Sequence, residues 1–507
     1  MDPVALGIDI GTSSIKVLAL DSNGRVLAEA SHPLETVQTA PGHAEQHPDD
    51  WKAATIAAVA DIGRTVPGLL KSVEILGVCG AAHIPVMLDS TGSLLRRAIM
   101  WTDQRSAKVA QRLDRTHGEE IARLSLNRPT ATWTLPQLRW LAENEPDVVE
   151  RLAHLLFGKD FLVAWMTAEF VTDTGNATSS MLFDAQNGRW SPRLMDLANI
   201  PERVLPVVVE SSDVVGDLRP TAADALGLRA GLPVIAGALD SICELLALGV
   251  AHPGEAMLRL GTAGGVMSVR EQPAAHPQLI SYPFLDRGWA SQAFTTSAGG
   301  SLRWLQRLLN NPDSRSADLA EGTTFAALDE AAAAVPPGAD GLVFHPYLLG
   351  ERAPHWDPEL RASFTGLAMQ HDRRHLVRAV MEGIACSMRD CHDVLADSGS
   401  SIRKLRATGG GTRSDELSQI TSNVLRLPVH RMRAAGSALG AAMLAGATAG
   451  LFDDLEAAVN TCTRERDVMR PDERTSDVYG RLIEHYRAVT EALRPLYQDA
   501  AVTSETT

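Results

Sequence analysis

Two short segments of this 507-residue chain share one pattern, and they begin about half a chain length apart. Residues 6–14 read LGIDIGTSS, and residues 258–265 read LRLGTAGG. In both, apolar residues precede a Gly-Thr pair and resume after it, which predicts two strands joined by a tight turn. Small residues at such a turn let backbone N–H groups and hydroxyls approach a phosphate closely. One Gly-Thr turn is most often an ordinary hairpin, but its recurrence in each half indicates a duplicated fold that closes on one nucleotide.

The two segments differ at one charged position, because only the first contains a carboxylate. Asp9 lies two residues before Gly11, inside an apolar strand. A carboxylate buried there needs a cation, since an unpaired buried charge is costly. The sequence leaves two partners open: Lys16 on the following strand, or a metal ion bound on the side of the first segment.

Composition indicates an intracellular enzyme. Hydrophobic residues make up 45% of the chain, enough for the two or three cores that its length requires. The net charge of −15, without a dense run of Lys and Arg, argues against nucleic acid as the partner. The five cysteines show no CxxC spacing, so neither a disulfide framework nor a zinc site is indicated. Without a signal-like segment or a long apolar run, we expect a cytoplasmic protein with no membrane contact.

Both halves alternate short apolar runs with helical stretches, which predicts an α/β fold. Strands are expected over 4–20, 75–88, 234–237 and 405–408, and helices over 51–62, 106–113, 301–309, 381–395 and 437–449. We place the boundary between two domains near residues 245–255. The expected division is an N-terminal domain over 1–248, a C-terminal domain over 249–490 and a tail over 491–507.

Six segments follow one another in an order that resembles the FGGY family of carbohydrate kinases, and within it the xylulokinases. They read GIDIGTSSIK at 7–16, WTDQR at 101–105, GALD at 237–240, LGTAG at 260–264, HPYLLGERAP at 345–354 and GGGTRS at 409–414. Residues 362–382 fit the family's second signature throughout. The first signature, over 134–144, fits less well, because Gln137 stands where the family usually has lysine.

The resemblance extends to about residue 445, and it implies both a fold and an activity. The implied fold is two ribonuclease-H-like domains of the actin type around a central cleft. The implied activity is phosphorylation of a sugar hydroxyl with ATP and Mg²⁺, most simply conversion of a ketopentose such as D-xylulose to its 5-phosphate. The partner is then a small sugar, without nucleic acid or membrane, and a homodimer is left open.

Asp240 is the candidate general base. A sugar hydroxyl is a poor nucleophile near pH 7, so the reaction needs a group that accepts its proton. Asp240 follows an apolar strand and a glycine turn, where a carboxylate commonly projects into a cleft, but Asp is equally common as the N-cap of a helix such as one starting at Ser241. The residues alone leave both roles open. The family resemblance implies the catalytic role.

The resemblance also implies which residues bind ATP and metal. Mg²⁺ is assigned to Asp9, reached largely through water. The nucleotide contacts are assigned to Thr12, Ser13, Lys16, Gly261, Thr262, Gly299, Arg303, Gly410, Gly411 and Ser414. Three of these have simpler alternatives: Lys16 as a solvated strand end, Arg303 as a charge on a helix surface, and the glycine run as a plain loop.

The expected sugar pocket departs in part from the pattern of the family that this chain resembles. The resemblance assigns it to Ala82, His83, Trp101, Asp103, Asp240 and Ser241. Xylulokinases typically carry Met-His where this chain has Ala82-His83, and asparagine where it has Ser241. The first change enlarges the pocket and the second shortens a polar arm, so gluconate-like aldonates and polyols stay open as substrates. His83 itself could be a core histidine instead.

Two other classes of function stay open on the sequence. One is a nucleotide-gated binding module of the same fold, since a fold does not fix a function. The other is a metal-dependent hydrolase that uses the histidine pair His43 and His47, or His371 and His375. The prolines around the first pair and the absence of an HExxH carboxylate near the second argue against the hydrolase.

Overall fold

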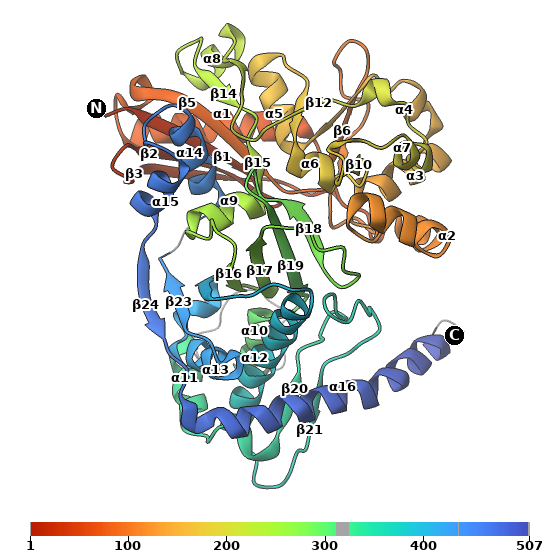
Figure 1. Cartoon of the computed structure of the whole chain (residues 1–507), viewed down its shortest axis with the longest axis vertical. Coiled ribbons are helices and arrows are strands. Elements are labelled where there is room, and N and C mark those ends of the chain that lie inside the picture. The colour runs from red at the N-terminus through yellow and green to blue at the C-terminus, as the bar shows by residue number, and fades with distance from the viewer. Residues whose placement is uncertain (1, 311–323, 434–435, 505–507) are drawn as a thin grey trace.

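The computed structural model describes residues 2–310, 324–433 and 436–504, which form two lobes along the long axis of the molecule (Figure 1). Each lobe is built on a seven-stranded sheet. The upper lobe in Figure 1 holds the sheet of the N-terminal half, and the lower lobe holds the sheet of the C-terminal half. The predicted α/β class is therefore confirmed.

The N-terminal sheet has the strand order β13-β14-β5-β1-β2-β3, and β15 also pairs with β5. Its central strand β1 is antiparallel to β2 and parallel to β5. The strands are β1 (Val4–Ile10), β2 (Ser14–Asp21), β3 (Val26–Pro33), β5 (Val73–Gly80), β13 (Val214–Asp217), β14 (Pro233–Ile235) and β15 (Ala238–Leu239).

The C-terminal sheet has the strand order β18-β19-β17-β16-β22-β23-β24. Its central strand β16 is antiparallel to β17 and parallel to β22, as β1 is to β2 and β5. The strands are β16 (Glu255–Leu260), β17 (Gly264–Arg270), β18 (Ile280–Pro283), β19 (Trp289–Thr295), β22 (Lys404–Thr408), β23 (Val429–Met432) and β24 (Glu465–Met469). Both Gly-Thr segments thus form the predicted strand–turn–strand unit, at equivalent places in the two sheets.

Helices cover the two large sheets, and the short strands pair with one another in two-stranded sheets. The helices are α1 (Pro48–Thr65), α2 (Ala107–Ser125), α3 (Thr134–Asn144), α4 (Pro146–Glu150), α5 (Gly158–Thr167), α6 (Thr174–Ser179), α7 (Pro192–Ala198), α8 (Pro220–Leu226), α9 (Asp240–Ala247), α10 (Gly299–Asn310), α11 (Phe325–Ala333), α12 (Arg373–Asp397), α13 (Asp415–Leu425), α14 (Ser437–Thr448), α15 (Leu455–Cys462) and α16 (Ser476–Ser504). The short strands are β4 (Glu45–Gln46), β6 (Pro85–Leu88), β7 (Ala98–Ile99), β8 (His154–Phe157), β9 (Val171–Asp173), β10 (Phe183–Asp184), β11 (Arg189–Trp190), β12 (Val207–Val209), β20 (Val343–His345) and β21 (Ser363–Thr365).

The expected elements are present, with three informative differences. The segment 75–88 is two strands, β5 and β6, separated by a loop at residues 81–84, because His83 has a φ of 64° and a β-strand requires a negative φ. The helix expected over 106–113 continues as α2 to Ser125. Helix α16 crosses the C-terminal lobe and extends beyond it (Figure 1), so the expected division at residue 490 falls inside one helix.

Helix α14 belongs to the C-terminal half of the sequence but packs on the N-terminal sheet, against β1, β5 and α9. The approach is so close that a Cβ atom on Gly7 would lie 1.9 Å from the Ala438 carbonyl oxygen. One on Gly77 would lie 2.5 Å from that of Ala441. Only glycine on the strands permits this contact, and the small side chains of α14 complete it.

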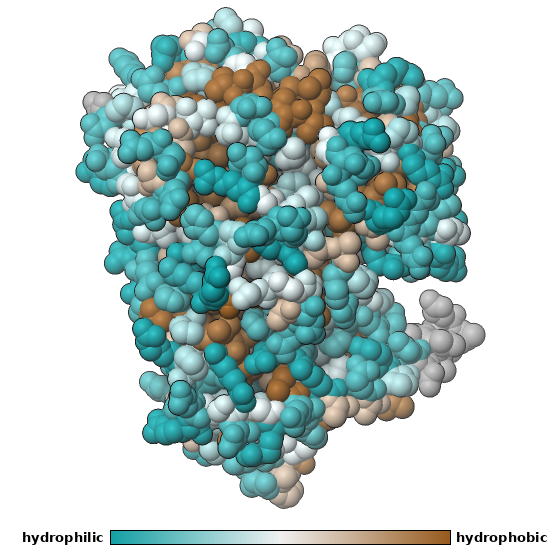
Figure 2. Space-filling view, in the orientation of Figure 1, coloured by the Kyte–Doolittle hydropathy of each residue, from teal (hydrophilic) through white to brown (hydrophobic). Residues whose placement is uncertain are grey.

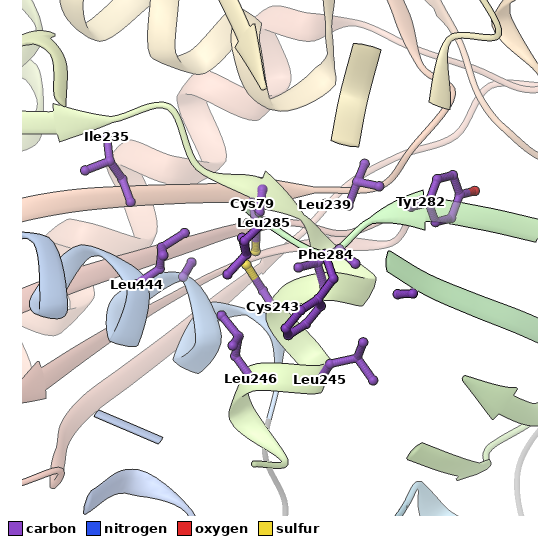
Figure 3. Packing of buried hydrophobic residues seen from close by; sticks show 14 of the residues in the cluster. Cys79, Ile235, Leu239, Cys243, Leu245, Leu246, Tyr282, Phe284, Leu285 and Leu444 are labelled. Atoms are coloured by element: carbon purple, nitrogen blue, oxygen red, sulfur yellow. The ribbon is translucent and has the colours of Figure 1, made fainter. Parts of the chain in front are cut away.

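A single apolar cluster extends from the N-terminal lobe into the C-terminal lobe. Figure 3 shows part of it, where Cys243 of α9 lies between Leu444 of α14 and Phe284, just after β18. The two lobes therefore share a core. On the face drawn in Figure 2 hydrophilic residues dominate, with brown areas near the top of the view. No helix within the described ranges is long and apolar enough to cross a membrane.

Candidate active site

Asp9 is one centre of the site, near the end of β1. The sheet register places it beside Lys16 on β2 and Cys79 on β5, and the Cys79 thiol donates to Asp9 Oδ1 at 3.6 Å. The Asp9 side chain is buried. Burial, together with the negative charge of Asp240, raises the pKa of Asp9 to about 7, while Lys16 acts in the opposite direction. A carboxyl in this state is readily ionised when a cation arrives.

Asp240 is the first residue of α9, and Leu239 is the N-cap. The Asp240 side chain therefore does not serve as the N-cap that the sequence left open. Its Oδ1 accepts the N–H of the next residue, Ser241, at 2.6 Å. Burial raises the pKa of Asp240, whereas the Ser241 N–H and the guanidinium of Arg259 lower it.

Glu244 is a site residue that the sequence reasoning missed. It lies one turn after Asp240 on α9, and Arg259 Nη1 donates to Glu244 Oε2 at 2.9 Å. Arg259 belongs to β16 in the other lobe, two residues before Gly261, so this ion pair joins the lobes. The i to i+4 spacing of Asp240 and Glu244 on one helix face was the available signal.

The site holds more carboxylates than cations. Burial raises the pKa of Glu244 as it does for Asp9 and Asp240, and the cations that act on them are Lys16 and Arg259. A divalent cation fits such a charge balance. In the described part of the chain, no three His, Cys, Asp or Glu side chains are grouped closely enough to hold a metal by themselves. The donor set therefore suits an ion that keeps most of its water ligands, as Mg²⁺ does.

Two side chains from other segments donate hydrogen bonds to Thr12 of the first Gly-Thr turn. Trp101 Nε1 donates to Thr12 Oγ1 at 2.8 Å, and Gln46 Nε2 donates to the Thr12 carbonyl at 2.6 Å. Ser13 and Lys16 are exposed. Two predicted site residues from different segments, Thr12 and Trp101, are thus in direct contact.

The second Gly-Thr turn is hydrogen-bonded to the first residues of α10. The Gly299 N–H donates to the Gly261 carbonyl at 2.8 Å, and the Gly300 N–H donates to the Thr262 carbonyl at 3.0 Å. Arg303 Nη2 donates to Thr262 Oγ1. The structure therefore brings together Gly261, Thr262, Gly299 and Arg303.

The glycine run after β22 packs against the same turn. A Cβ atom on Gly411 would lie 2.9 Å from the Leu260 carbonyl oxygen, directly before Gly261, and Gly410 is exposed. Ser414 is buried instead. Its hydroxyl donates to Asp329 at 2.5 Å and accepts the Leu417 N–H as the N-cap of α13, so it fixes this loop from behind.

His83 lies in a buried aromatic group with Trp133 and Tyr282. Its Nδ1 donates to the Ser179 carbonyl at 2.7 Å, and its Nε2 accepts the Tyr282 hydroxyl at 2.9 Å. Burial lowers the pKa of His83 to about 4, so the ring is neutral at pH 7. Tyr282 comes from β18 of the other lobe and was also missed, because nothing in the sequence connects it to residue 83.

Asp103 is fully buried, and both of its oxygens are occupied. Oδ2 accepts the Ala44 N–H at 2.6 Å, and Oδ1 accepts the Arg105 N–H at 2.8 Å and its Nε at 2.9 Å. These bonds hold the loop that carries Trp101. Ala82 and Ser241 are partly exposed.

The histidine pairs have local structural contacts. His375 Nδ1 accepts the Asp372 N–H in a capping box at the start of α12, and His371 Nδ1 accepts the Ala368 N–H. His43 Nδ1 bonds to the Thr39 hydroxyl at 3.1 Å. Among the residues that the structure describes, neither pair belongs to a group of three or more His, Cys, Asp or Glu side chains that could hold a metal.

Comparison with known proteins gives matches over nearly the whole chain. Residues 4–247 match the N-terminal domain of the FGGY family of carbohydrate kinases, and residues 256–449 match its C-terminal domain. A xylulose kinase of Bacillus subtilis is 31% identical over 489 residues, 96% of each chain, and a gluconokinase of the same organism is 26% identical over 464 residues, 90% of each chain. The crystal structure of a xylulose kinase from Rhodospirillum rubrum matches with a TM-score of 0.90 at 32% identity, over 97% of this chain and 99% of that one. This chain therefore belongs to the FGGY family of carbohydrate kinases, which use ATP.

Proposed function

We propose that this kinase phosphorylates a ketopentose such as D-xylulose at the 5-hydroxyl, with Asp240 as the general base. The observation that carries the proposal is the place of Asp240 at the first position of α9, where its charge acts on Asp9 before the first Gly-Thr turn and is acted on by Arg259 before the second. A carboxylate there can receive a proton from a sugar hydroxyl in the cleft. The N-terminus of a helix favours its ionised form, which offsets part of the effect of burial.

The reaction then proceeds in one displacement. The sugar hydroxyl gives its proton to a carboxylate oxygen of Asp240 while its oxygen forms a bond to the γ-phosphorus of ATP. The bond between that phosphorus and the bridging oxygen breaks, and ADP leaves with the electron pair. Thr12, Ser13 and Lys16 hold the transferred group from one lobe, and Gly261 and Thr262 hold it from the other.

Asp9 would hold Mg²⁺ through water ligands. When bound, the ion neutralises phosphate charge and supplies part of the positive charge that the three carboxylates lack. Burial and the negative charge of Asp240 raise the pKa of Asp9, and a bound cation would offset both effects.

The adenosine of ATP would lie against the exposed Gly410 and the neighbouring Gly411, with Gly299 and Arg303 beside the phosphates. Gly299 and Arg303 both bond to the second Gly-Thr turn, which supports a shared role. Ser414 acts on this surface through the cap that it provides for α13.

For the sugar we propose a pocket formed by Ala82, His83, Trp101 and Ser241 around Asp240, with Asp103 supporting Trp101. Both nitrogens of His83 are engaged. Its contact with a sugar hydroxyl therefore requires exchange of the Tyr282 bond at Nε2. Tyr282 belongs to the opposite lobe, so movement between the lobes can make this exchange.

Gluconate is the second candidate substrate. The gluconokinase relative aligns over 90% of the chain, and Ala82 leaves more room than the methionine typical of xylulokinases. An ADP-release assay with D-xylulose, other pentuloses, polyols and gluconate tests the choice. We expect the highest kcat/KM for D-xylulose. A kcat/KM for gluconate at least tenfold higher than that for D-xylulose would overturn the proposed substrate.

A further inference from the structure

A fully buried ammonium group lies behind the proposed active site and takes no part in the chemistry above. The Lys159 side chain, at the start of α5, is 0% exposed, and those of Asp160 and Asp173 are each 1% exposed. Lys159 Nζ donates to Asp160 Oδ1 at 2.5 Å, to the Ala236 carbonyl at 2.8 Å and to Asp173 Oδ1 at 2.9 Å. These contacts use all three donors of the ammonium.

The contact with Ala236 leads to Asp240, four residues further along the chain. The Ala236 N–H also donates to the Asp213 carbonyl at 2.9 Å, so both polar groups of this residue are fixed. Gly237 follows with a φ of 77°, and a Cβ there would lie 1.8 Å from the Val78 carbonyl oxygen. The chain therefore has no room to adjust between Ala236 and β15, and a shift at Ala236 is passed to Asp240.

The contact with Asp173 leads to His83. Asp173 is the N-cap of α6, where its Oδ2 accepts the N–H of Gly175 at 2.9 Å and that of Asn176 at 3.3 Å. Helix α6 ends at Ser179, whose carbonyl accepts the His83 Nδ1 proton at 2.7 Å. The ammonium of Lys159 thus holds the start of the helix whose last residue orients His83.

We propose that Lys159 is a positioning residue that fixes Asp240 and His83 relative to each other. The inference rests on the proposed roles of those two residues. A buried ion pair adds little stability over well-packed apolar side chains, whereas three directed N–H bonds define where an acceptor lies. Geometry matters in such a site, because a displacement of about 1 Å can lower a rate by roughly 100-fold.

The test is Lys159→Met, which keeps an unbranched side chain one heavy atom shorter and removes the donors. With the best substrate of the panel, we expect kcat to fall at least ~30-fold, while the KM for ATP changes less than about threefold. The kinetics are measured well below the unfolding temperature of the variant. Arg487→Met is the matched control: it removes the cation that bonds to buried Asp390 at 2.7 Å in the C-terminal lobe, and its kcat should stay near that of the parent.

A double variant separates positioning from stability. In Lys159→Met with Asp160→Asn, one buried negative charge is removed with the positive one, so the unfolding temperature should recover relative to Lys159→Met, and the protein should fold even where the single variant does not. The kcat should remain low, because the Ala236 carbonyl and Asp173 still lack their donor. Recovery of kcat in parallel with the unfolding temperature would overturn the proposal.

Asp240→Asn in the same assay separates a failure of Asp240 as the base from a failure of Lys159 as the positioning residue. If Asp240→Asn keeps turnover near the parent value, the proposed base is wrong, and Lys159 has no base to position. If Asp240→Asn is inactive while folded Lys159→Met keeps the parent kcat, only the positioning role is overturned.

Discussion

Three carboxyl groups at the candidate active site have raised pKa values, and burial is the first cause for each. Their neighbours differ. Asp9 lies beside Lys16, while Glu244 is bonded to Arg259, whose charge also lowers the pKa of Asp240. Carboxyl groups of one site therefore meet different charges, and on this difference we propose metal binding at Asp9 and proton transfer at Asp240.

Replacing Asp240 by asparagine tests the base directly. The change keeps the size of the side chain and removes its capacity to accept a proton. We expect kcat to fall at least ~10²-fold, the usual contribution of a positioned general base. Binding of ATP and sugar, measured by calorimetry, should persist. A kcat within a few fold of the parent would show that another group accepts the proton.

Asp9→Asn should make the ligand-free protein more stable at pH 8 and less active. In the folded state the pKa of Asp9 is raised from 3.8 to about 7, so stability is lost as the pH rises from about 4 through 7. At pH 8 the ionised carboxyl costs at most roughly 4 kcal/mol, which asparagine avoids. Denaturant unfolding at pH 4 and pH 8 measures the difference, and the gain should appear only at the higher pH. In the assay, the variant should need more Mg²⁺ for half-maximal turnover.

Asp21→Asn is the control, because the pKa of Asp21 is lowered where that of Asp9 is raised. Burial raises the pKa of Asp21, but bonds from Arg25 and Asn23 lower it more, so the net shift is downward. Compared with the parent protein, this variant should have a lower free energy of unfolding at pH 8, and the difference should be smaller at pH 4. If the stability gain of Asp9→Asn were the same at both pH values, Asp9 would not carry the raised pKa.

At the scale of single elements, the loop 81–84 between β5 and β6 presents Ala82 and His83 to the proposed sugar pocket. Ala82→Met should raise the ratio of kcat/KM for D-xylulose over longer polyols and aldonates by about tenfold or more. A few heavy atoms of apolar volume are worth ~1–3 kcal/mol of discrimination. His83→Ala should weaken every accepted sugar, because a hydroxyl loses its partner. If neither variant changes kcat/KM for any sugar, this loop is part of the core alone.

The elements that the sequence predicted are those with a local pattern. The Gly-Thr hairpins and α10 follow from apolar spacing within short segments, and the structure places Gly261 and Gly299 in contact. Glu244 was missed although its i to i+4 spacing from Asp240 was a local signal, whereas Tyr282 was missed because its partner lies in another part of the chain. The Tyr282 hydroxyl bonds to His83 although the two residues are 199 positions apart in the sequence, and a periodic pattern predicts only local structure.

At the scale of the whole molecule, several polar contacts cross between the lobes, among them the Asn127 side chain on the backbone of Ser281, and two of them lie at the candidate site. Arg259 reaches Glu244, and Tyr282 reaches His83. Both lie next to residues proposed to bind substrate, so a change in the separation of the lobes alters the site itself. The division of the chain into two α/β lobes was predictable from the repeated pattern, but these contacts depend on how the lobes pack.

We expect the lobes to approach each other when both substrates bind, because the proposed phosphate donors lie on both. Closure would also exclude water from the phosphoryl group. Small-angle scattering with sugar and a non-hydrolysable ATP analogue should show a smaller radius of gyration than the free protein. Each ligand alone should give a smaller change. An identical radius with and without both ligands would contradict the expectation.

The position of α14 has a consequence for how the chain is made. Residues 437–448 complete the N-terminal sheet by covering Gly7 and Gly77, yet they are synthesised long after those strands. During translation the face of β1 and β5 under α14 therefore stays uncovered until most of the chain has left the ribosome. The N-terminal lobe cannot reach its final packing as an independent nascent domain, and the last step of its folding waits for the C-terminal half.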